Sequence, residues 1–160
     1  MSGLPALKVL GIGAFADGLP DWAAMAAFAR GEAGLVEGAP KKPAPSMLPA
    51  NERRRAPDSV LLALRVAEAA CEQPGADPAA LPSVFTSTHG DLAITDYMCA
   101  TLASAPTEVS PTKFHNSVHN AAAGYWTIGV GCHAPATAIS AFDASFAQGL
   151  IEAALQIAID

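Results

Sequence analysis

The sequence predicts a layered α/β domain with a mostly parallel sheet. Short apolar segments typical of buried strands alternate with longer helical patterns along the 160 residues, and this alternation is typical of parallel α/β folds. Apolar residues make up 51% of the chain, which is enough for one sizeable core at this length. No internal repeat at solenoid spacing is present. We therefore expect a single domain over residues 1–160.

The first half of the chain supplies one strand and two helices. Residues 7–15, LKVLGIGAF, form an apolar run bounded by glycine, which predicts a buried strand. Residues 21–30 predict a short helix with Asp21 as its N-cap. Residues 37–50 contain four prolines and no apolar period, so we expect a long loop. Residues 57–73 form the clearest helix, with a largely apolar sequence closed by Pro-Gly.

The second half repeats the alternation. We expect strands at 82–88 and 136–142, and helices at 91–102, 114–127 and 144–158. An α/β unit normally returns to the sheet after a helix, whereas this sequence stops directly after the last helical pattern. Two interpretations stay open: the last helix covers a sheet edge, or the sequence is a C-terminally truncated piece of a longer protein.

Charge and cysteine content exclude several classes. The net charge is −6 and Lys and Arg number only nine, so we expect neither nucleic-acid binding nor attachment to anionic membranes. The N-terminal apolar run is too short for a signal peptide or a membrane span. The three cysteines, Cys71, Cys99 and Cys132, are widely spaced without a CxxC motif, which favours a reducing compartment and a cytoplasmic location. The 15% charged residues leave little polar cover for a monomer and favour a surface hidden by a partner.

Residues 114–131, FHNSVHNAAAGYWTIGVG, carry the most unusual polar pattern. His115, Asn116, His119 and Asn120 would share one side of the expected helix, just ahead of small residues that allow close packing. Two histidines at i and i+4 can bind one metal, but the glutamate of HExxH is missing and no third ligand is evident. Pocket or interface hydrogen bonding is the favoured interpretation, and we expect no metal.

Three other motifs have simpler explanations. His89-Gly90-Asp91 joins a strand to a helix, where α/β proteins bind ligands, but Asp91 alone is better explained as an N-cap. Gly11 and Gly13 fail the GxGxxG spacing, so a dinucleotide site and other cofactors are not expected. Cys132 and His133 are adjacent and in a turn, so a buried or surface thiol is favoured over a catalytic pair.

The stretch 139–149, ISAFDASFAQG, predicts a sharp turn from a strand into a helix. A cysteine at such a helix N-terminus would be an activated nucleophile. The residues present are Asp143 and, two positions on, Ser145. On the residues alone, Asp143 is interpreted as an N-cap.

Several segments together resemble the N-terminal half of β-ketoacyl synthases. Asn120-Ala121-Ala122-Ala123-Gly124 resembles the family's Asn-Ala-Ala-Gly helix, and 131–135 is close to its Gly-x-x-Gly-Pro turn, with Ala134 at the second glycine. Ile139-Ser140-Ala141-Phe142 resembles the strand before the nucleophile. The segments VLGIGAF, WAAMAAFARGEAGL, RRRAPDSVLLALRVAEAACEQPG and VFTSTHGDLAITDYM resemble the earlier elements. The resemblance covers almost the whole chain and implies the N-terminal half of a thiolase-like layered α/β/α domain with a mostly parallel mixed sheet.

The nucleophile is the main departure from the family. In this match the family's cysteine falls on Asp143, and a carboxylate cannot form an acyl thioester. The family's catalytic histidines belong to a C-terminal half that this sequence does not contain. The resemblance therefore implies a ketosynthase-like protein that is not an enzyme on its own, similar to chain-length factors. Such a protein pairs with an active ketosynthase in fatty-acid, polyketide or aryl-polyene-type chain assembly.

The resemblance also implies where the functional residues lie. Pocket or interface positions are His115, Asn116, His119, Asn120, Gly124, Phe142 and Ser145. The family dimerises along the strand before the nucleophile, so Ala136–Phe142 is the expected interface, with a ketosynthase subunit or a second copy as partner. An acyl carrier protein is a further expected partner.

Two alternatives remain open at this point. One is a module that binds acyl carrier protein or acyl-CoA without turnover. The other is an acyltransferase or hydrolase that uses Ser145 or Asp143 with His115 or His119.

Overall fold

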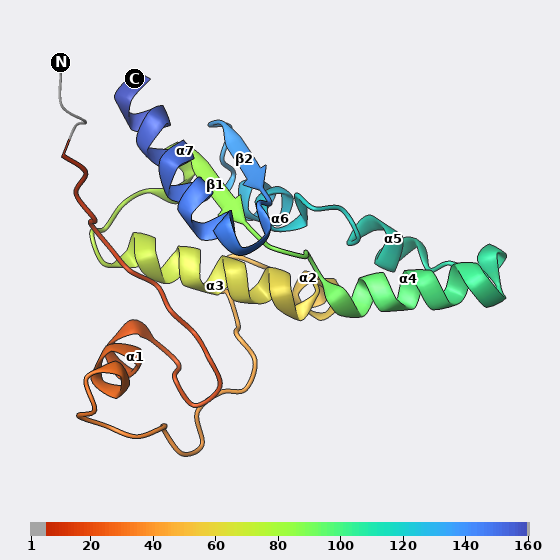
Figure 1. Cartoon of the computed structure of the whole chain (residues 1–160), viewed down its shortest axis with the longest axis horizontal. Coiled ribbons are helices and arrows are strands. Elements are labelled where there is room, and N and C mark those ends of the chain that lie inside the picture. Colours follow the sequence, from red (N-terminus) through yellow and green to blue (C-terminus); the bar gives the residue numbers. More distant parts are fainter. Residues whose placement is uncertain (1–5, 160) are drawn as a thin grey trace.

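The structure, a computed structural model, describes residues 6–159. In Figure 1 the strands lie side by side with helices on either side of them. The α-helices are α1 (Trp22–Ala29), α2 (Ala50–Arg55), α3 (Asp58–Glu72), α4 (Leu92–Ser104), α5 (Pro111–His115), α6 (Ala121–Val130) and α7 (Ser145–Ile159); the strands are β1 (Ser83–Thr86) and β2 (Ala136–Ile139). Short 3₁₀ helices cover Pro78–Ala80, Pro106–Glu108 and Phe142–Ala144.

The two strands run parallel, as expected for strands joined by a long crossover. Ser83 pairs with Ala136 and Thr86 with Ile139. Phe85 faces α6, where its ring packs edge-on against Trp126 at 6.2 Å between centroids. Thr86 faces the opposite side, because successive side chains alternate across a strand, and meets Gly149 of α7. The expected layered α/β/α arrangement is therefore confirmed, with a sheet of two strands in the described part of the chain.

The core lies between α3, α6 and the loop before α2. Its buried members are Leu48, Ala56, Val60, Leu61, Leu64 and Trp126. Leu64 is fully buried on α3 and Trp126 is 3% exposed on α6. Both predicted helices in the first half are confirmed: Asp21 caps α1 by accepting a hydrogen bond from the Ala24 amide at 2.9 Å, and α3 occupies almost the whole of 57–73.

The predicted strand at 7–15 is wrong. Residues 6–15 are not in a strand, and they run along α3 (Figure 1). The side-chain amide of Gln73 donates to the Ile12 carbonyl and accepts from the Ile12 amide at 3.0 Å. Gln73 thus takes both backbone groups that a neighbouring strand would use. Gly11 and Gly13 lie directly over the carbonyls of Ala70 and Val66, one helical turn apart, where a Cβ would collide.

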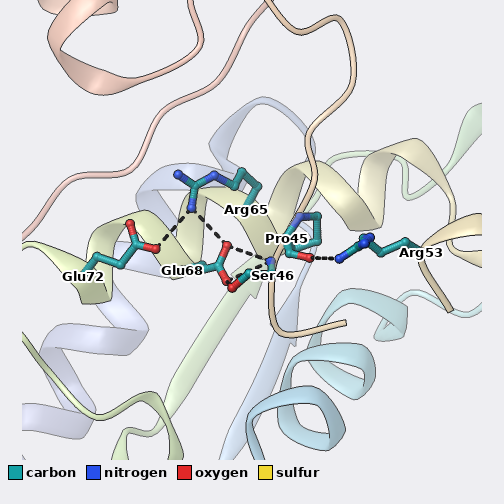
Figure 2. Close-up of polar contacts among 6 residues, drawn as sticks. All are labelled: Pro45, Ser46, Arg53, Arg65, Glu68 and Glu72. Atoms are coloured by element: carbon teal, nitrogen blue, oxygen red, sulfur yellow. Dashed lines mark hydrogen bonds and ion pairs between the residues drawn. The ribbon is translucent and has the colours of Figure 1, made fainter. Parts of the chain in front are cut away.

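The loop at 37–50 is confirmed, apart from the start of α2 at its end, and a polar cluster fixes it to α3 (Figure 2). The Glu68 carboxylate accepts from the Ser46 amide at 3.0 Å, from the Ser46 hydroxyl, and from Arg65 at 3.0 Å. From the other side, Arg53 donates to the carbonyls of Pro45 and Leu48. These bonds hold Leu48 in the core.

The predicted helix at 114–127 is helical in its second half but is not continuous. The chain forms α5 up to His115, turns through 116–120, and begins α6 at Ala121. The Ser117 hydroxyl donates to the Phe114 carbonyl at 2.8 Å, which is the local competition by which serine disfavours a helix interior. His115 and Asn120 therefore stand at the end of one helix and the start of another.

The remaining predicted elements are present. β1 and β2 are shorter than the predicted 82–88 and 136–142, while α4 and α7 lie close to 91–102 and 144–158. Among residues 6–159, no helix has both the length and the apolar character that a membrane crossing requires.

Candidate functional site

The turn between β2 and α7 contains the most unusual backbone of the molecule. β2 ends at Ile139, a short 3₁₀ helix covers Phe142–Ala144, and α7 begins at Ser145. Phe142 has a φ of 50°, and no other residue among 6–159 except glycines has a positive φ. For a residue with a Cβ, this conformation costs about 1–2 kcal/mol. The strain must therefore be offset by surrounding contacts.

Hydrogen bonds from three side chains hold this turn. The Ser145 hydroxyl donates to the Phe142 carbonyl at 2.7 Å and accepts from the Ala141 amide at 3.0 Å. Thr88, in the loop after β1, also donates to the Phe142 carbonyl, at 3.2 Å. Ser140 returns a bond to the Thr88 carbonyl at 3.0 Å. The loops that follow the two strands are thereby joined at the carboxyl edge of the sheet.

Ser145 and Asp143 differ in burial and in hydrogen bonding from what the sequence predicted. Ser145 is 6% exposed and its hydroxyl is occupied by the two bonds above. Asp143 is exposed, and within the described chain its carboxylate takes part in none of the turn's hydrogen bonds. The interpretation of Asp143 as an N-cap is therefore not supported. The Ser145 hydroxyl, and not the Asp143 carboxylate, makes the hydrogen bonds of the turn. Phe142, one residue earlier, is the strained position.

Asn116 is the buried member of the polar group around α5 and α6. It is 4% exposed. Its amide nitrogen donates to the Arg55 carbonyl at the end of α2, and its carbonyl oxygen accepts from the Tyr125 hydroxyl, both at 3.1 Å. Burial raises the pKa of Tyr125 above its ordinary value, while the bond to Asn116 acts in the opposite direction. Asn116 therefore joins α2, the end of α5 and α6.

The two histidines face different surroundings. The His119 Nε2 lies 3.3 Å from the Ser87 carbonyl, after β1. The His115 ring packs edge-on against Tyr125 at 6.4 Å between centroids. Because the helix breaks between them, they do not form the i, i+4 pair predicted from the sequence. In the described residues, no three His, Cys, Asp or Glu side chains come together as a metal site would need.

The predicted site residues do not line one common cavity. One of about 560 Å³ lies between α3 and β1, and its polar lining includes Asp91, Asn116 and His119. Another of about 540 Å³ lies between α6 and the Met47–Glu52 segment, and its lining includes His115, Asn120 and Gly124. Phe142, Asp143 and Ser145 line neither. The structure therefore divides the predicted residues into three groups.

Two other sequence interpretations are confirmed. Asp91 caps α4 by accepting from the Ile94 amide at 2.9 Å, and its second oxygen accepts from Ser59 at 2.8 Å. Cys132 is a buried thiol whose sulfur donates to the Leu81 carbonyl at 3.4 Å, while His133 beside it is exposed.

Two residues that support the predicted site residues carry no sequence motif of their own. Thr88 bonds the Phe142 carbonyl of the turn, and Tyr125 bonds the buried Asn116. Neither side chain was singled out from the sequence. His89, at the predicted strand-to-helix junction, packs its ring against Phe142 at 5.7 Å between centroids. The one local signal was that Thr88 and His89 lie at the end of the predicted strand 82–88.

Comparison with known proteins agrees with this arrangement. A family model described as "Beta-ketoacyl synthase, N-terminal domain" matches residues 22–160. No curated protein matches the chain. Among solved structures, a chain of the complex between the ketosynthase ApeO and its chain length factor ApeC from Xenorhabdus doucetiae is 28% identical, with a TM-score of 0.73. The match covers 96% of this chain but only 63% of that chain.

These matches bear out the resemblance and the layered α/β fold that it implies. The family match covers most of the chain, including the strained turn and the helices that hold it. The chain therefore belongs to the β-ketoacyl synthase N-terminal-domain family.

Proposed function

We propose that this protein is a ketosynthase-like partner subunit, similar to a chain-length factor, that acts in acyl-chain assembly without a nucleophile of its own. The observation that carries the proposal is the composition of the turn between β2 and α7. Phe142, Asp143 and Ala144 occupy it, so it offers a carboxylate and an aromatic ring in place of a thiol. Neither group can carry an acyl chain as a thioester.

The cysteines elsewhere do not replace the missing thiol. Cys132 is buried at the end of α6 and bonded to Leu81. Cys71 lies on α3, where burial and then the neighbouring Glu72 raise its pKa, so less thiolate is present at neutral pH. Cys99 is exposed on α4. None belongs to the turn at the sheet edge.

The partner we propose is a ketosynthase subunit, with homodimerisation as the competing arrangement. The solved relative is a ketosynthase bound to its chain length factor. The chain also exposes many large apolar residues, including Phe142 at 63%, Phe146 at 74% and Ile128 at 84%. Apolar surface on this scale is typical of a protein that hides part of itself against a partner. We place the complex in the cytoplasm, and an acyl carrier protein would deliver its substrate.

Affinity capture from the native cell, followed by native mass spectrometry, tests this function. We expect a one-to-one assembly with a ketosynthase that retains its cysteine. A chain recovered only as a monomer or homodimer would contradict the proposal. The mass of the captured chain also shows whether it carries additional sequence.

Direct catalysis by Ser145 predicts a different result. A serine nucleophile needs a base within hydrogen-bond reach, but the described bonds of Ser145 go to the backbone of Ala141 and Phe142. We therefore expect no covalent labelling of Ser145 or Asp143 by an acyl-phosphonate or acyl-chloromethyl-ketone probe. Labelling that disappears in Ser145→Ala, but not in the exposed control Ser117→Ala, would support the acyltransferase or hydrolase alternative.

Acyl-group binding without turnover is a second candidate. The cavity between α3 and β1 has about 560 Å³ and mainly apolar walls, including Val60, Val66 and Ala67, and ligand sites commonly have 300–1,000 Å³. This candidate predicts that a medium-chain acyl-CoA raises the melting temperature of the isolated chain, whereas free CoA does not. Equal melting temperatures with both ligands would exclude it.

A further inference from the structure

The segment at residues 6–15 is held on α3 by few contacts. In the described chain, its hydrogen bonds to the rest of the molecule are the two between the Ile12 backbone and the Gln73 side chain. Its apolar side chains add little anchoring, because Leu7, Val9 and Leu10 are all more than half exposed. A segment with few buried apolar contacts and exposed hydrogen bonds opens locally at a low cost in free energy.

A tight turn fixes the end of this segment that leads into the rest of the chain. The backbones of Ala16 and Leu19 exchange two hydrogen bonds, at 2.8 and 2.9 Å, and Leu19 is buried. Separation of Ile12 from Gln73 would therefore release residues 6–15 and leave the turn at 16–19 in place as a hinge.

The same segment forms part of the wall of the cavity between α3 and β1. The α3 side of this cavity extends from Ser59 to Ala70, which is about 16 Å along a helix. Gly13 also lines the cavity, and it lies directly over the Val66 carbonyl, where a Cβ would collide. The position of the segment against the cavity thus depends on a glycine at residue 13.

The lining of this cavity favours an apolar ligand. Asp91 and Asn116 belong to its polar part, and both side chains already bond within the protein. Most of the remaining wall is aliphatic, with Val66, Ala67 and Val84 among its members. Apolar walls of this kind recognise a ligand mainly by burying its apolar surface. An elongated cavity of this composition fits a linear hydrocarbon chain.

We propose that residues 6–15 form a hinged lid on the cavity between α3 and β1, and that a linear hydrocarbon chain enters this cavity when Ile12 separates from Gln73. This inference rests on the second candidate above, acyl-group binding without turnover, and assigns the segment that controls entry. It does not depend on the identity of the protein partner.

Variants of Gln73 and Gly13 release the lid by different routes. Gln73→Ala removes both bonds to Ile12, whereas Gln73→Glu keeps an acceptor for the Ile12 amide and sets a carboxylate against its carbonyl. Gly13→Ala places a Cβ against the Val66 carbonyl. Gly34→Ala is the matched control, because nothing lies within 4 Å of its added Cβ. We expect faster hydrogen exchange of the Ile12 amide in the first three variants and no change in the control.

Stopped-flow binding of cis-parinaric acid, a fatty acid whose fluorescence rises in an apolar environment, measures entry into the cavity. We expect the wild-type rate to level off at high probe concentration, because opening of the lid limits it. The three lid variants should bind ~10-fold faster, the effect of losing one or two exposed hydrogen bonds. Ala63→Phe, which places a ring in the cavity wall, should abolish binding. Melting temperatures show that each variant is folded, and the exposed Gln73 carries the test if Gly13→Ala does not fold.

The outcomes separate the lid from the functions proposed above. Equal rates in the wild type and the Gln73 variants, or probe binding that persists in Ala63→Phe, would overturn the lid. Absence of probe binding in every variant and in the wild type would overturn the lid together with the acyl-binding candidate. Neither result bears on the partner-subunit function, which the capture experiment tests independently.

Discussion

The Tyr125 hydroxyl donates a hydrogen bond to the buried Oδ1 of Asn116 at 3.1 Å. The Asn116 amide then donates to the Arg55 carbonyl, 61 residues away in the chain. This bridge explains why the chain turns between α5 and α6. In an uninterrupted helix, Asn116 would lie on the same helix as His119 and Asn120. The turn instead lets the Asn116 side chain reach both Arg55 of α2 and Tyr125 of α6.

Replacing Asn116 should therefore destabilise the fold. Asn116→Ala leaves the Arg55 carbonyl and the Tyr125 hydroxyl without their partner, and a buried unsatisfied group costs about 1–3 kcal/mol. We expect the free energy of unfolding in urea to fall by about 2–3 kcal/mol. Asn120→Ala is the matched control, because Asn120 is exposed and its side chain makes no capping bond. A similar loss in both variants would contradict the role of the bridge.

Tyr125 should make the stability depend on pH in the alkaline range. Burial raises its pKa in the folded state above the ordinary value of 10.0, so the folded chain holds this proton more tightly than the unfolded chain. The contribution is fully present below pH 10 and is lost as the pH rises through the folded pKa. We expect the stability of the wild type relative to Tyr125→Phe to fall above pH 10.

The difference in stability between the wild type and Tyr125→Phe isolates the contribution of the Tyr125 proton. Cys71 also has a raised pKa, but it contributes equally to the wild type and to Tyr125→Phe. Urea unfolding between pH 8 and 11 measures the effect. A constant stability difference across this range would show that the proton on Tyr125 is not linked to folding.

The sequence predicted the elements whose signals are local. The helices α1 and α4 were found through their caps, Asp21 and Asp91, whose side chains bond amides three residues ahead. The helix α3 was found through its length and apolar content. The caps and the apolar pattern lie within a few residues of the helix that they define, so a single sequence is enough to identify them.

Features that depend on distant residues were missed. The apolar run at 7–15 looks like a strand, but strand pairing needs a neighbour, and Gln73 takes the backbone groups of Ile12 instead. Similarly, Asn116 breaks the expected helix because its partners are Arg55 and Tyr125. The strain at Phe142 depends on Thr88 from the other strand's loop. Contacts between residues this far apart in the chain leave no pattern in the local sequence.

Glu68 should control the order of the proline-rich loop. Its carboxylate accepts from Ser46 and Arg65, and its side chain is only 13% exposed. Hydrogen bonds to charged groups contribute about 1.5–3 kcal/mol, so Glu68→Ala should lower the stability by an amount in this range. It should also speed amide exchange and proteolysis within 37–49. Glu72→Ala is the control, since its 3.5 Å contact with Arg65 is exposed and should contribute less than about 1 kcal/mol.

Two helix glycines should respond in opposite directions to the same substitution. Gly149, in α7, lies against the Thr86 side chain of β1, and a Cβ there would collide with it. Thr86 is β-branched and therefore stiff, so Gly149→Ala must push α7 away from the sheet and cost about 1–3 kcal/mol. Gly124, in α6, has nothing within 4 Å of the same position. Gly124→Ala should therefore stabilise the isolated chain by about 0.5–1 kcal/mol, the helix preference for alanine.

Thermal unfolding of the two variants beside the wild type checks this prediction. A destabilised Gly149→Ala beside a stabilised Gly124→Ala would show that α7 packs on β1 at the distance described. Because Gly124 lines the cavity beside the Met47–Glu52 segment, the same variant also tests the predicted pocket or interface role of this position. A stabilised monomer that binds the ketosynthase less tightly would assign Gly124 to the interface. Unchanged binding would leave it a feature of the helix alone.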